Sequence, residues 1–526
     1  MKKMSVLTAV SLVAVMLFTG CASTSNSSDT ETKLVILHTN DHHGSVTARP
    51  DKEGVGHGGL AERATFIKQV RAEYENVLLV DAGDINTGMA VSNMFHAEPD
   101  LQAMNAMGYE TTVFGNHEFD KSLSVLKEQM KSTSFAWLSS NIKYKDTGKY
   151  LGTPYIIKKY KGFTVGIFGL TTLRTTILER PDASLQFYDE IETAKEMVSF
   201  LRNKKKVDIV IEVGHLGDIE ETPDQTTSVK LAQAVEGIDL IVDGHSHSFM
   251  EKPNVVNGTP IVSANEWGKY VGQGILTIKN KKIVSFDWAP VEITDKAFPP
   301  DAEVATLIKP YLEKAEASLK EVVMVTSAEF PFGKKQTRYR EMATGDILCD
   351  AAVDYSKQMG VDVDFALFNG GGIRTGLPKG DVTREQMITM LPFENYVYIL
   401  TLKGSDVKEL FSFVGTINQG AGGFAQVSKE VHYTITYDAE GKNGKMSDLT
   451  INGKPVDDNK VYRIATNDYM AKGGDGYTVM LKALDSYNLR LIMNEVFIQY
   501  AAKLPQPVSP TTDGRINIVG GVPAEF

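Results

Sequence analysis

The sequence predicts an α/β protein with two large domains, and three observations support this prediction. The chain has 526 residues, which is too long for one ordinary hydrophobic core. Hydrophobic residues make up 42% and charged residues 23%, the balance of a folded globular protein. Short apolar runs alternate with stretches of helical periodicity, a pattern that is typical of layered α/β domains.

The beginning of the chain is predicted to be a targeting signal rather than part of the fold. Two lysines precede an apolar run over residues 6–18, so residues 1–20 are expected to form a signal peptide. The Thr-Gly that precedes Cys21 resembles a bacterial lipobox, in which the cysteine receives acyl chains after cleavage. An ordinary signal peptide with an accidental cysteine is the alternative. Residues 21–32 are mostly small and polar and suit a flexible tether.

The lipobox resemblance also implies a location. Ala22, rather than Asp, follows the cysteine, which in Gram-negative lipoproteins indicates sorting to the outer membrane. We therefore expect a protein of the cell envelope, held at the membrane through Cys21. The chain has two cysteines, which excludes a disulfide framework, and Cys349 is expected to be a buried, inert thiol.

Residues 33–298 contain five apolar runs that each end in a cluster of Asp, Asn, His or Gly. The runs lie at residues 33–38, 77–80, 111–114, 207–213 and 238–242. The clusters that follow them are Asp41-His42-His43, Gly83-Asp84, Gly115-Asn116-His117-Glu118, Gly214-His215 and Gly244-His245-Ser246-His247. A single cluster of this kind is more often a turn than a ligand site. Ligands bind at the carboxyl ends of strands in α/β domains, so five clusters together predict a site.

The donor atoms in these clusters indicate a metal site. They offer carboxylate and amide oxygens and imidazole nitrogens, and no thiolate. Nine of the ten histidines lie before Phe249. Such donors suit Mg, Mn, Zn, Co or Fe rather than copper(I) or an iron–sulfur cluster.

The order of the clusters, Asp-x-His, Gly-Asp, Gly-Asn-His-Glu, His and Gly-His-x-His, resembles the calcineurin-like metallophosphoesterases. The longer motifs at residues 37–44 and 115–120 are similar to the 5'-nucleotidase branch, secreted or lipid-anchored bacterial enzymes that include UDP-sugar hydrolases. This resemblance covers nearly the whole chain after residue 33. It implies a four-layer αββα catalytic domain over residues 33–298 that binds two divalent ions.

The resemblance also assigns roles to individual residues. One ion would be held by Asp41, His43 and His247, the other by Asn116, His215 and His245, and Asp84 would bridge the two. His117 would stabilise charge at the phosphate or protonate the leaving oxygen, with Asp120 orienting its ring. The alternative is that His117 only supports a neighbouring ligand through a hydrogen bond.

The sequence pattern changes after residue 298. A proline-rich break and an amphipathic helix at residues 301–321 predict a connector over residues 299–332, followed by a second α/β domain over residues 333–526. Three polar clusters in this domain, each more often a turn when taken alone, together resemble the substrate domain of 5'-nucleotidases. That resemblance implies phosphate and nucleoside contacts from Arg340, Asn369 and Arg374, base stacking between Phe393 and Tyr469, and ribose contacts from Asp475.

These expectations combine into one function. The chain is predicted to hydrolyse nucleoside 5'-monophosphates with a water activated by two metal ions, outside the cytoplasm, for nucleotide salvage. Nucleoside di- and triphosphates and nucleotide sugars are further candidate substrates. The alternatives are a 2',3'-cyclic nucleotide phosphodiesterase/3'-nucleotidase and, in another class, a surface lipoprotein without catalysis. The net charge of −11 argues against nucleic-acid polymers as partners, and no obligate protein partner is inferred.

Overall fold

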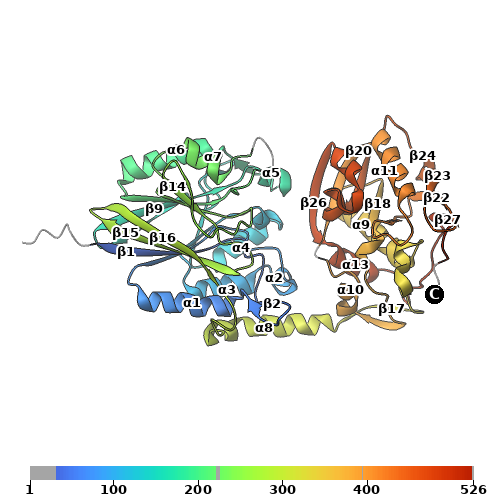
Figure 1. Cartoon of the computed structure of the whole chain (residues 1–526), viewed down its shortest axis with the longest axis horizontal. Helices are drawn as coiled ribbons and strands as arrows, with labels where there is room; N and C mark the ends of the chain where they lie inside the picture. Colours follow the sequence, from blue (N-terminus) through green and yellow to red (C-terminus); the bar gives the residue numbers. More distant parts are fainter. Residues whose placement is uncertain (1–30, 180, 221–224, 394, 524–526) are drawn as a thin grey trace, which may run out of the picture.

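The computed structural model describes residues 31–179, 181–220, 225–393 and 395–523. The predicted signal peptide, Cys21 and nearly all of the predicted tether lie outside these residues. Figure 1 shows two lobes, an N-terminal domain and a C-terminal domain, bridged along one side by the helix α8 (Ala302–Leu319). Within the described residues, no helix has the length and apolar character needed to cross a membrane.

The described residues of the N-terminal domain form two six-stranded sheets with the orders β16-β15-β1-β4-β5-β6 and β13-β14-β12-β11-β9-β8. The first comprises β1 (Thr32–Thr39), β4 (Val77–Asp81), β5 (Thr111–Val113), β6 (Ala136–Leu138), β15 (Tyr270–Lys279) and β16 (Lys282–Glu292). The second comprises β8 (Tyr155–Tyr160), β9 (Phe163–Thr171), β11 (Ile209–His215), β12 (Leu240–Asp243), β13 (Asn254–Val256) and β14 (Thr259–Val262). The central strands β1, β4, β5 and β6 run parallel, as do β9, β11, β12 and β14.

Helices cover the outer faces of both sheets (Figure 1). The helices α1 (Leu60–Glu73) and α3 (Glu98–Met107) cover the first sheet, and α6 (Glu190–Ser199) and α7 (Ser228–Ala234) cover the second. The shorter elements are β2 (Arg49–Pro50), β3 (Gly56–His57), α2 (Ala90–Met94), η1 (His117–Phe119), α4 (Leu123–Ser132), β7 (Ile142–Tyr144), α5 (Thr175–Leu178), β10 (Leu185–Phe187) and the π-helix η2 (Phe200–Lys205). The predicted αββα layering is confirmed.

The alternation of side chains along β1 explains these layers. Leu34 and Ile36 point into the core between the two sheets, whereas Val35 and Leu37 point into the core under α1 and α3. Successive side chains of a strand face opposite sides, so a strand that is apolar at every position needs cover on both faces. Burying each such side chain contributes about 1.5–3 kcal/mol. The strand ends that carry the polar clusters are therefore fixed by two cores.

The connector helix α8 belongs to the N-terminal domain for most of its length. Asp301 caps it by accepting a hydrogen bond from the backbone N–H of Val304 (3.2 Å). Val304 and Ile308 are buried in the core under α1 and α3, and Gln102 Nε2 donates to the hydroxyl of Tyr311 (2.9 Å). The helix ends at Leu319, close to the predicted boundary at residue 321.

The C-terminal domain is built around a five-stranded sheet with the order β21-β18-β25-β20-β26. Its strands are β18 (Phe365–Asn369), β20 (Tyr396–Lys403), β21 (Ala425–Val427), β25 (Val461–Asn467) and β26 (Asp485–Ile492). The helices α9 (Ala343–Gln358) and α13 (Met493–Ala501) pack on one face and α11 (Gly404–Thr416) on the other. Cys349 is a free, buried cysteine within α9, as predicted.

Two smaller sheets complete this domain. One pairs β17 (Val322–Thr326) with β19 (Gly380–Thr383), and the other has the order β24-β23-β22-β27. The remaining elements are η3 (Gly333–Arg338), η4 (Gly370–Gly372), α10 (Arg384–Met390), β22 (Val431–Tyr437), β23 (Lys445–Ile451), β24 (Lys454–Pro455), α12 (Asp468–Ala471), η5 (Gly474–Gly476), η6 (Thr478–Lys482) and β27 (Ile516–Gly520).

Candidate metal centre and substrate cavity

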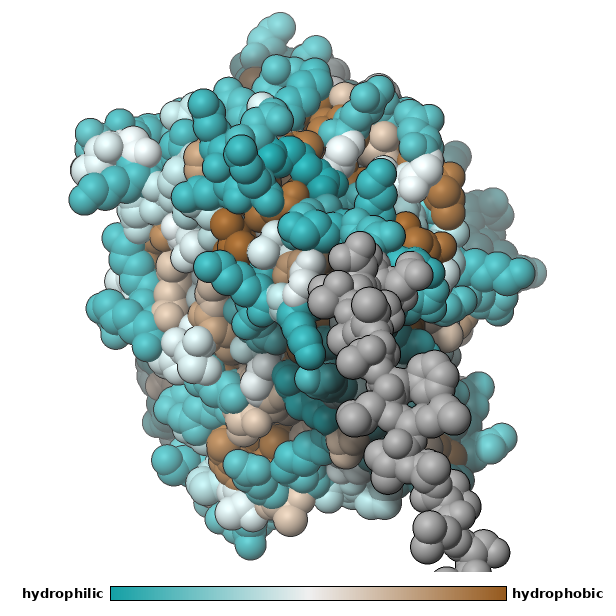
Figure 2. Space-filling view, turned by 90° about the vertical axis from the view of Figure 1, so that its left-hand side faces the viewer, coloured by the Kyte–Doolittle hydropathy of each residue, from teal (hydrophilic) through white to brown (hydrophobic). Residues whose placement is uncertain are grey.

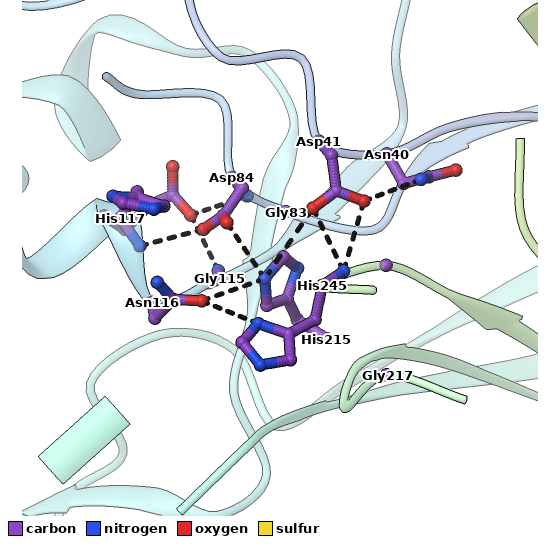
Figure 3. A network of polar contacts seen from close by, with 12 residues as sticks. Asn40, Asp41, Gly83, Asp84, Gly115, Asn116, His117, His215, Gly217 and His245 are labelled. Atoms are coloured by element: carbon purple, nitrogen blue, oxygen red, sulfur yellow. Dashed lines mark hydrogen bonds and ion pairs between the residues drawn. The ribbon is translucent and has the colours of Figure 1, made fainter. Parts of the chain in front are cut away.

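The fold gathers all seven predicted metal ligands at the carboxyl ends of parallel strands. Figure 3 shows five of them converging: Asp41, Asp84, Asn116, His215 and His245. Asp41 and His43 follow β1, Asp84 follows β4, Asn116 follows β5, and His245 and His247 follow β12. His215 is itself the last residue of β11, so this strand extends two residues beyond the predicted end.

The backbone at this site is unusual. Five of the seven residues have a positive φ: Asp41 (50°), His43 (45°), Asp84 (56°), His245 (83°) and His247 (53°). Residues other than glycine rarely adopt this left-handed conformation, and such strain concentrates at functional sites. The strand ends are therefore bent so that the side chains turn toward a common centre.

The side chains form two groups that meet at Asp84. In the first group, His43 Nε2 and His247 Nε2 lie 3.0 Å apart, and His247 Nε2 lies 3.5 Å from Asp41 Oδ1. Asp84 Oδ2 lies 3.8 Å from His43 Nε2 and 3.1 Å from His215 Nε2, which belongs to the second group.

In the second group the amide of Asn116 is central (Figure 3). Its Oδ1 lies 3.3 Å from His215 Nε2 and 2.9 Å from His245 Nδ1. The two groups correspond to the two ligand sets that the sequence resemblance implied, and Asp84 lies between them.

Hydrogen bonds on the outer side of three imidazole rings fix which nitrogen faces the centre. His215 Nδ1 donates to the backbone O of Ala82 (2.7 Å), and His247 Nδ1 donates to Glu266 Oε2 (2.5 Å). His43 Nδ1 contacts the backbone O of Asn86 (3.3 Å). The Nε2 atom of each ring then faces the carboxylates, which is the arrangement that metal-binding histidines need.

The electrostatics also fit divalent cations. Burial lowers the pKa of His43 and of His245 to about 3, so both rings are neutral lone-pair donors at neutral pH. His245 Nε2 is buried without a hydrogen-bond partner. Burial also acts to lower the pKa of His215, but the carboxylates of Asp84 and Asp41 raise it to about 10. The site therefore favours positive charge between these carboxylates, and the donor set matches the hard to borderline metals predicted from the sequence.

His117 and Asp120 form a pair beside this centre. His117 Nδ1 lies 2.8 Å from Asp120 Oδ2, which also accepts a hydrogen bond from the hydroxyl of Thr87. The backbone N–H of His117 donates to Asp84 Oδ1 (2.8 Å). Burial acts to lower the pKa of His117, but the carboxylates of Asp120 and Asp84 raise it well above its usual value. A protonated imidazole is thus held next to the candidate metal centre.

Glu118 is a supporting residue to which the sequence assigned no role, although its motif was recognised. Its carboxylate is buried and accepts hydrogen bonds from the backbone N–H groups of Gly115 (2.7 Å), Asp84 (2.9 Å) and Ile85 (2.9 Å). It therefore ties the loop after β4 to the loop after β5. A side chain at Gly115 would place its Cβ 2.1 Å from Asp84 Oδ1, so glycine is required there.

Two further residues of the site, Glu266 and Glu179, were not predicted from the sequence. Glu266 holds His247, and Glu179 Oε1 accepts a hydrogen bond from Asn116 Nδ2 (3.3 Å), which leaves the amide oxygen free to face the histidines. The sequence contains no local signal for either residue. Glu266 lies 19 positions after His247 and Glu179 lies 63 positions after Asn116, with no recognised motif around them.

The C-terminal domain contains a cavity of about 800 Å³. Five of the six predicted substrate residues line it: Asn369, Arg374, Phe393, Tyr469 and Asp475. The sixth, Arg340, is not among the lining residues, whereas Arg338 is. The cavity is lined by residues of the C-terminal domain alone, as far as the described chain shows.

Two exposed aromatic rings and the carboxylate of Asp475 are among the groups that line this cavity. Phe393 and Tyr469 are 48% and 46% exposed, which is unusual for large aromatic side chains in a folded domain. Asp475 accepts hydrogen bonds from Asn369 Nδ2 (2.8 Å) and from the hydroxyl of Tyr469 (3.1 Å). The guanidinium of Arg374 lies 5.6 Å from the centroid of the Phe393 ring.

Three consecutive glycines, residues 370–372, follow β18 and have different roles. Gly371 and Gly372 line the cavity. Gly370 instead permits the chain to pack against itself, because a Cβ there would lie 1.9 Å from the backbone O of Thr337.

Comparison with known proteins agrees with this architecture. Residues 34–249 match the calcineurin-like phosphoesterase family, and residues 322–482 match the C-terminal domain of 5'-nucleotidases. A 5'-nucleotidase of Vibrio vulnificus is 32% identical, over 95% of this chain and 96% of its own length. Protein UshA of Escherichia coli is 31% identical, over 90% of this chain and 91% of its own.

A solved structure supports the same assignment. The 5'-nucleotidase precursor from Thermus thermophilus is 29% identical with a TM-score of 0.59, covering 93% of this chain and 99% of that one. The fold and the site thus define a calcineurin-like phosphoesterase. Within that class, the chain belongs to the 5'-nucleotidase family, and the predictions of its fold and of its enzyme class are confirmed.

Proposed function

We propose that this enzyme hydrolyses nucleoside 5'-monophosphates to nucleoside and phosphate by means of a water activated by two divalent ions. The observation that carries the proposal is the convergence of two groups of lone-pair donors on Asp84, with three imidazole rings fixed by outer hydrogen bonds. When bound there, the ions would supply an activated water and neutralise the phosphoryl oxygens.

The side chains beside the centre would complete the reaction. Asp41, His43 and His247 would hold one ion, and Asn116, His215 and His245 the other. His117 carries a proton on its free Nε2 while Asp120 accepts from Nδ1. It can stabilise negative charge on the phosphate and give this proton to the 5'-oxygen of the leaving nucleoside.

The cavity of the C-terminal domain would bind the nucleoside. Phe393 and Tyr469 offer exposed rings for the base, and stacking accepts any base because every base has a π-face. Asp475 can accept hydrogen bonds from the ribose hydroxyls. Arg374 and Arg338 line the same cavity and can contact the phosphate, so diphosphates, triphosphates and nucleotide sugars remain candidate substrates.

We propose that the two domains move relative to each other during turnover, because no residue of the candidate metal centre is among those that line the cavity. We place the hinge within the connector that the sequence predicts over residues 299–332. The contact of Tyr311 with Gln102 ties the first three turns of α8 to the N-terminal domain. The backbone N–H of Arg384 donates to Glu321 O (2.9 Å), which ties the end of the connector to the C-terminal domain. The hinge therefore falls near residues 316–321.

The proposed setting is the cell envelope, with nucleotide salvage as the purpose. It rests on the sequence of residues 1–32, which predicts a cleaved signal and an acylated Cys21 in the outer membrane of a Gram-negative cell.

A substrate panel tests the proposed activity. The chain is stripped of metal and supplied with Mg, Mn, Zn or Co singly, and phosphate release is measured from 5'-AMP, 3'-AMP, 2',3'-cyclic AMP and UDP-glucose. We expect 5'-AMP to be the best substrate and activity to depend on the added ion. A preference for the cyclic substrate would move the assignment to the cyclic phosphodiesterase alternative. No release with any ion would refute the proposal and leave a binding protein.

A further inference from the structure

One end of the N-terminal domain is strongly basic although the whole chain has a net charge of −11. We call it the basic end and define it as residues 31–33, 158–161, 202–208 and 279–282. These four segments contain eleven lysine and arginine residues and two acidic residues. Most of these side chains are exposed, including Lys33, Lys159, Lys161, Lys204, Lys205, Lys206, Lys281 and Lys282.

Contacts show that the four segments adjoin in space. Asp208 Oδ2 accepts a hydrogen bond from the backbone N–H of Thr164 (2.8 Å), next to the turn at residues 161–162 between β8 and β9. Asp208 Oδ1 lies 3.3 Å from Lys281 Nζ, in the turn between β15 and β16. Lys279 Nζ lies 3.7 Å from Glu31 Oε1, at the first described residue of the chain.

Little negative charge offsets this cluster. The carboxylate of Asp208 accepts a hydrogen bond from Thr164 and forms an ion pair with Lys281. Two half-buried basic residues of the cluster form ion pairs with neighbouring segments: Lys158 with Glu110, and Arg202 with Asp239. The exposed lysines at residues 159, 161, 204, 206 and 282 carry the remaining positive charge outward.

The basic end lies opposite the candidate metal centre. Residues 206–208 precede β11, whereas His215 ends it, so about 20 Å of strand separates them at roughly 3.3 Å per residue. In Figure 1 this end, with β1, β9 and β15, lies farthest from the C-terminal domain. Figure 2 looks directly at it and shows a mainly hydrophilic face without a large apolar patch.

The chain also enters the fold at this end. β1 begins at Thr32, which pairs with Ile278 next to Lys279. The predicted anchor, Cys21, lies ten residues before Glu31, so the tether can span at most about 35 Å when fully extended. An acylated Cys21 would thus keep the basic end close to the headgroups of the membrane that holds it.

We propose that the basic end is a docking surface for an anionic phospholipid bilayer, which holds the domain with its candidate metal centre facing away from the membrane. Clustered lysines attract anionic headgroups within about one Debye length, roughly 8–10 Å at physiological salt. A purely lipid-tethered domain would rotate freely, whereas docking would keep the candidate metal centre on the side away from the membrane. The inference goes beyond the proposed hydrolysis, which does not depend on it.

The test uses vesicle flotation with the chain from Ala22 onward, which retains every described residue and lacks the anchor. Vesicles contain phosphatidylcholine alone or with 30% phosphatidylglycerol. The test variant is K159Q/K161Q/K204Q/K282Q. The matched control, K357Q/K379Q/K445Q/K454Q, removes the same charge from exposed lysines of the C-terminal domain.

We expect the unmodified chain to bind the phosphatidylglycerol vesicles at 50 mM NaCl and to be released at 500 mM NaCl. The test variant should bind roughly tenfold more weakly or worse, and the control should bind like the unmodified chain. All three should keep the same melting temperature and the same rate with 5'-AMP, so that failure of docking is distinguishable from failure of the proposed function.

Three results would overturn the proposal. One is equal binding to vesicles with and without phosphatidylglycerol, and another is equal binding of the two quadruple variants. The third is binding of a 20-base-pair DNA duplex as tight as that of the vesicles, which would make the basic end a general polyanion surface.

Discussion

The candidate metal centre and the substrate cavity are built on opposite physical principles. Asp41, Asp84 and His215 are almost completely buried. Hydrogen bonds to the backbone O of Ala82 and to the Glu118 carboxylate hold His215 and the backbone of Asp84, respectively. Phe393 and Tyr469 are about half exposed. Chemistry at a phosphorus atom needs ligands fixed to a fraction of an ångström, whereas stacking on a base tolerates many positions of the base. The difference suggests that turnover depends on the first region and affinity on the second.

The most severe test of this comparison is Asp84→Asn. Asp84 lies 3.8 Å from His43 in one ligand group and 3.1 Å from His215 in the other, so the loss of its negative charge should affect both ions. We expect kcat to fall about 1000-fold or more, since electrostatic terms at such sites contribute several kcal/mol. Metal content by elemental analysis should fall as well.

The matched control for that variant is Asp287→Asn, which removes an exposed carboxylate of β16. It should behave like the unmodified enzyme. An Asp84→Asn enzyme with full metal content and full activity would show that the two groups do not act as one site.

His117→Ala should have the next largest effect. Loss of the proton donor is expected to lower kcat by about 100- to 10,000-fold while the metal content stays unchanged. A parallel loss of metal would make His117 a structural residue instead.

The pH dependence gives a second measurement of the same pair. Because Asp120 raises the pKa of His117, the protonated ring persists as pH rises, and its deprotonation should lower activity on the alkaline side. Asp120→Asn removes that carboxylate, lowers the pKa of His117 and should move the alkaline limb of the pH–rate profile to lower pH. An unchanged limb would mean that His117 is not the titrating group.

Glu266→Gln tests whether a residue that only holds a candidate ligand in place contributes to metal affinity. The amide can offer its oxygen to His247 Nδ1 but lacks the charge, so the affinity for one of the two ions should drop about 10- to 100-fold. Titration of the metal-free enzyme, followed by elemental analysis, measures this directly. Glu303→Gln, at an exposed position on α8, is the control, and equal metal binding by both variants would contradict the role of Glu266.

The sequence predicted the fold and the gathering of the candidate metal ligands because both depend on local patterns. Each candidate ligand lies at the end of a strand or within four residues after it, and the periodicity of the strand shows where that end must lie. Glu179 and Glu266 could not be found in this way. Their partners lie 63 and 19 residues away in the sequence, and only the packed chain brings them together.

The residues that line the cavity differ from the predicted set at one arginine, for a similar reason. Arg338 and Arg340 stand two residues apart, and the choice between them depends on how the chain turns after η3. Arg338 ends this short helix and lines the cavity, whereas the backbone O of Arg340 accepts a hydrogen bond from Gln426 Nε2 (2.8 Å). A residue pattern does not encode such a turn.

Tyr469→Ala tests whether the cavity contributes to substrate affinity rather than to turnover. Loss of one stacking ring should lower kcat/KM for 5'-AMP about tenfold, mainly through KM, because base stacking contributes about 1–3 kcal/mol. Tyr469→Phe should retain nearly full activity. Ribose 5-phosphate, which has no base, should be hydrolysed equally by all three enzymes, and a loss with this substrate as well would place Tyr469 in the chemistry rather than in binding.

The smallest expected effect concerns a buried carboxylate outside both sites. Asp346 in α9 has no hydrogen bond to either oxygen, and its nearest cation is Arg515 Nε at 3.5 Å. Burial raises the pKa of Asp346 to about 8, with Arg515 opposing the shift. The folded state therefore holds a proton that the unfolded chain releases near pH 4, so this residue costs stability progressively as pH rises from about 4 to 8.

Asp346→Asn should remove that cost. We expect the variant to be more stable than the unmodified chain by roughly 1 kcal/mol at pH 8, with the difference vanishing near pH 4, as measured by thermal unfolding. Asp350→Asn is the matched control with the opposite sign, because Asp350 Oδ1 accepts from Arg515 Nη1 at 2.9 Å. If Asp346→Asn were destabilising at pH 8, the ionised carboxylate would be satisfied in the fold. The charge of Asp346 would then be stabilised by its surroundings, as the charge of Asp84 is by the hydrogen bond from the backbone N–H of His117.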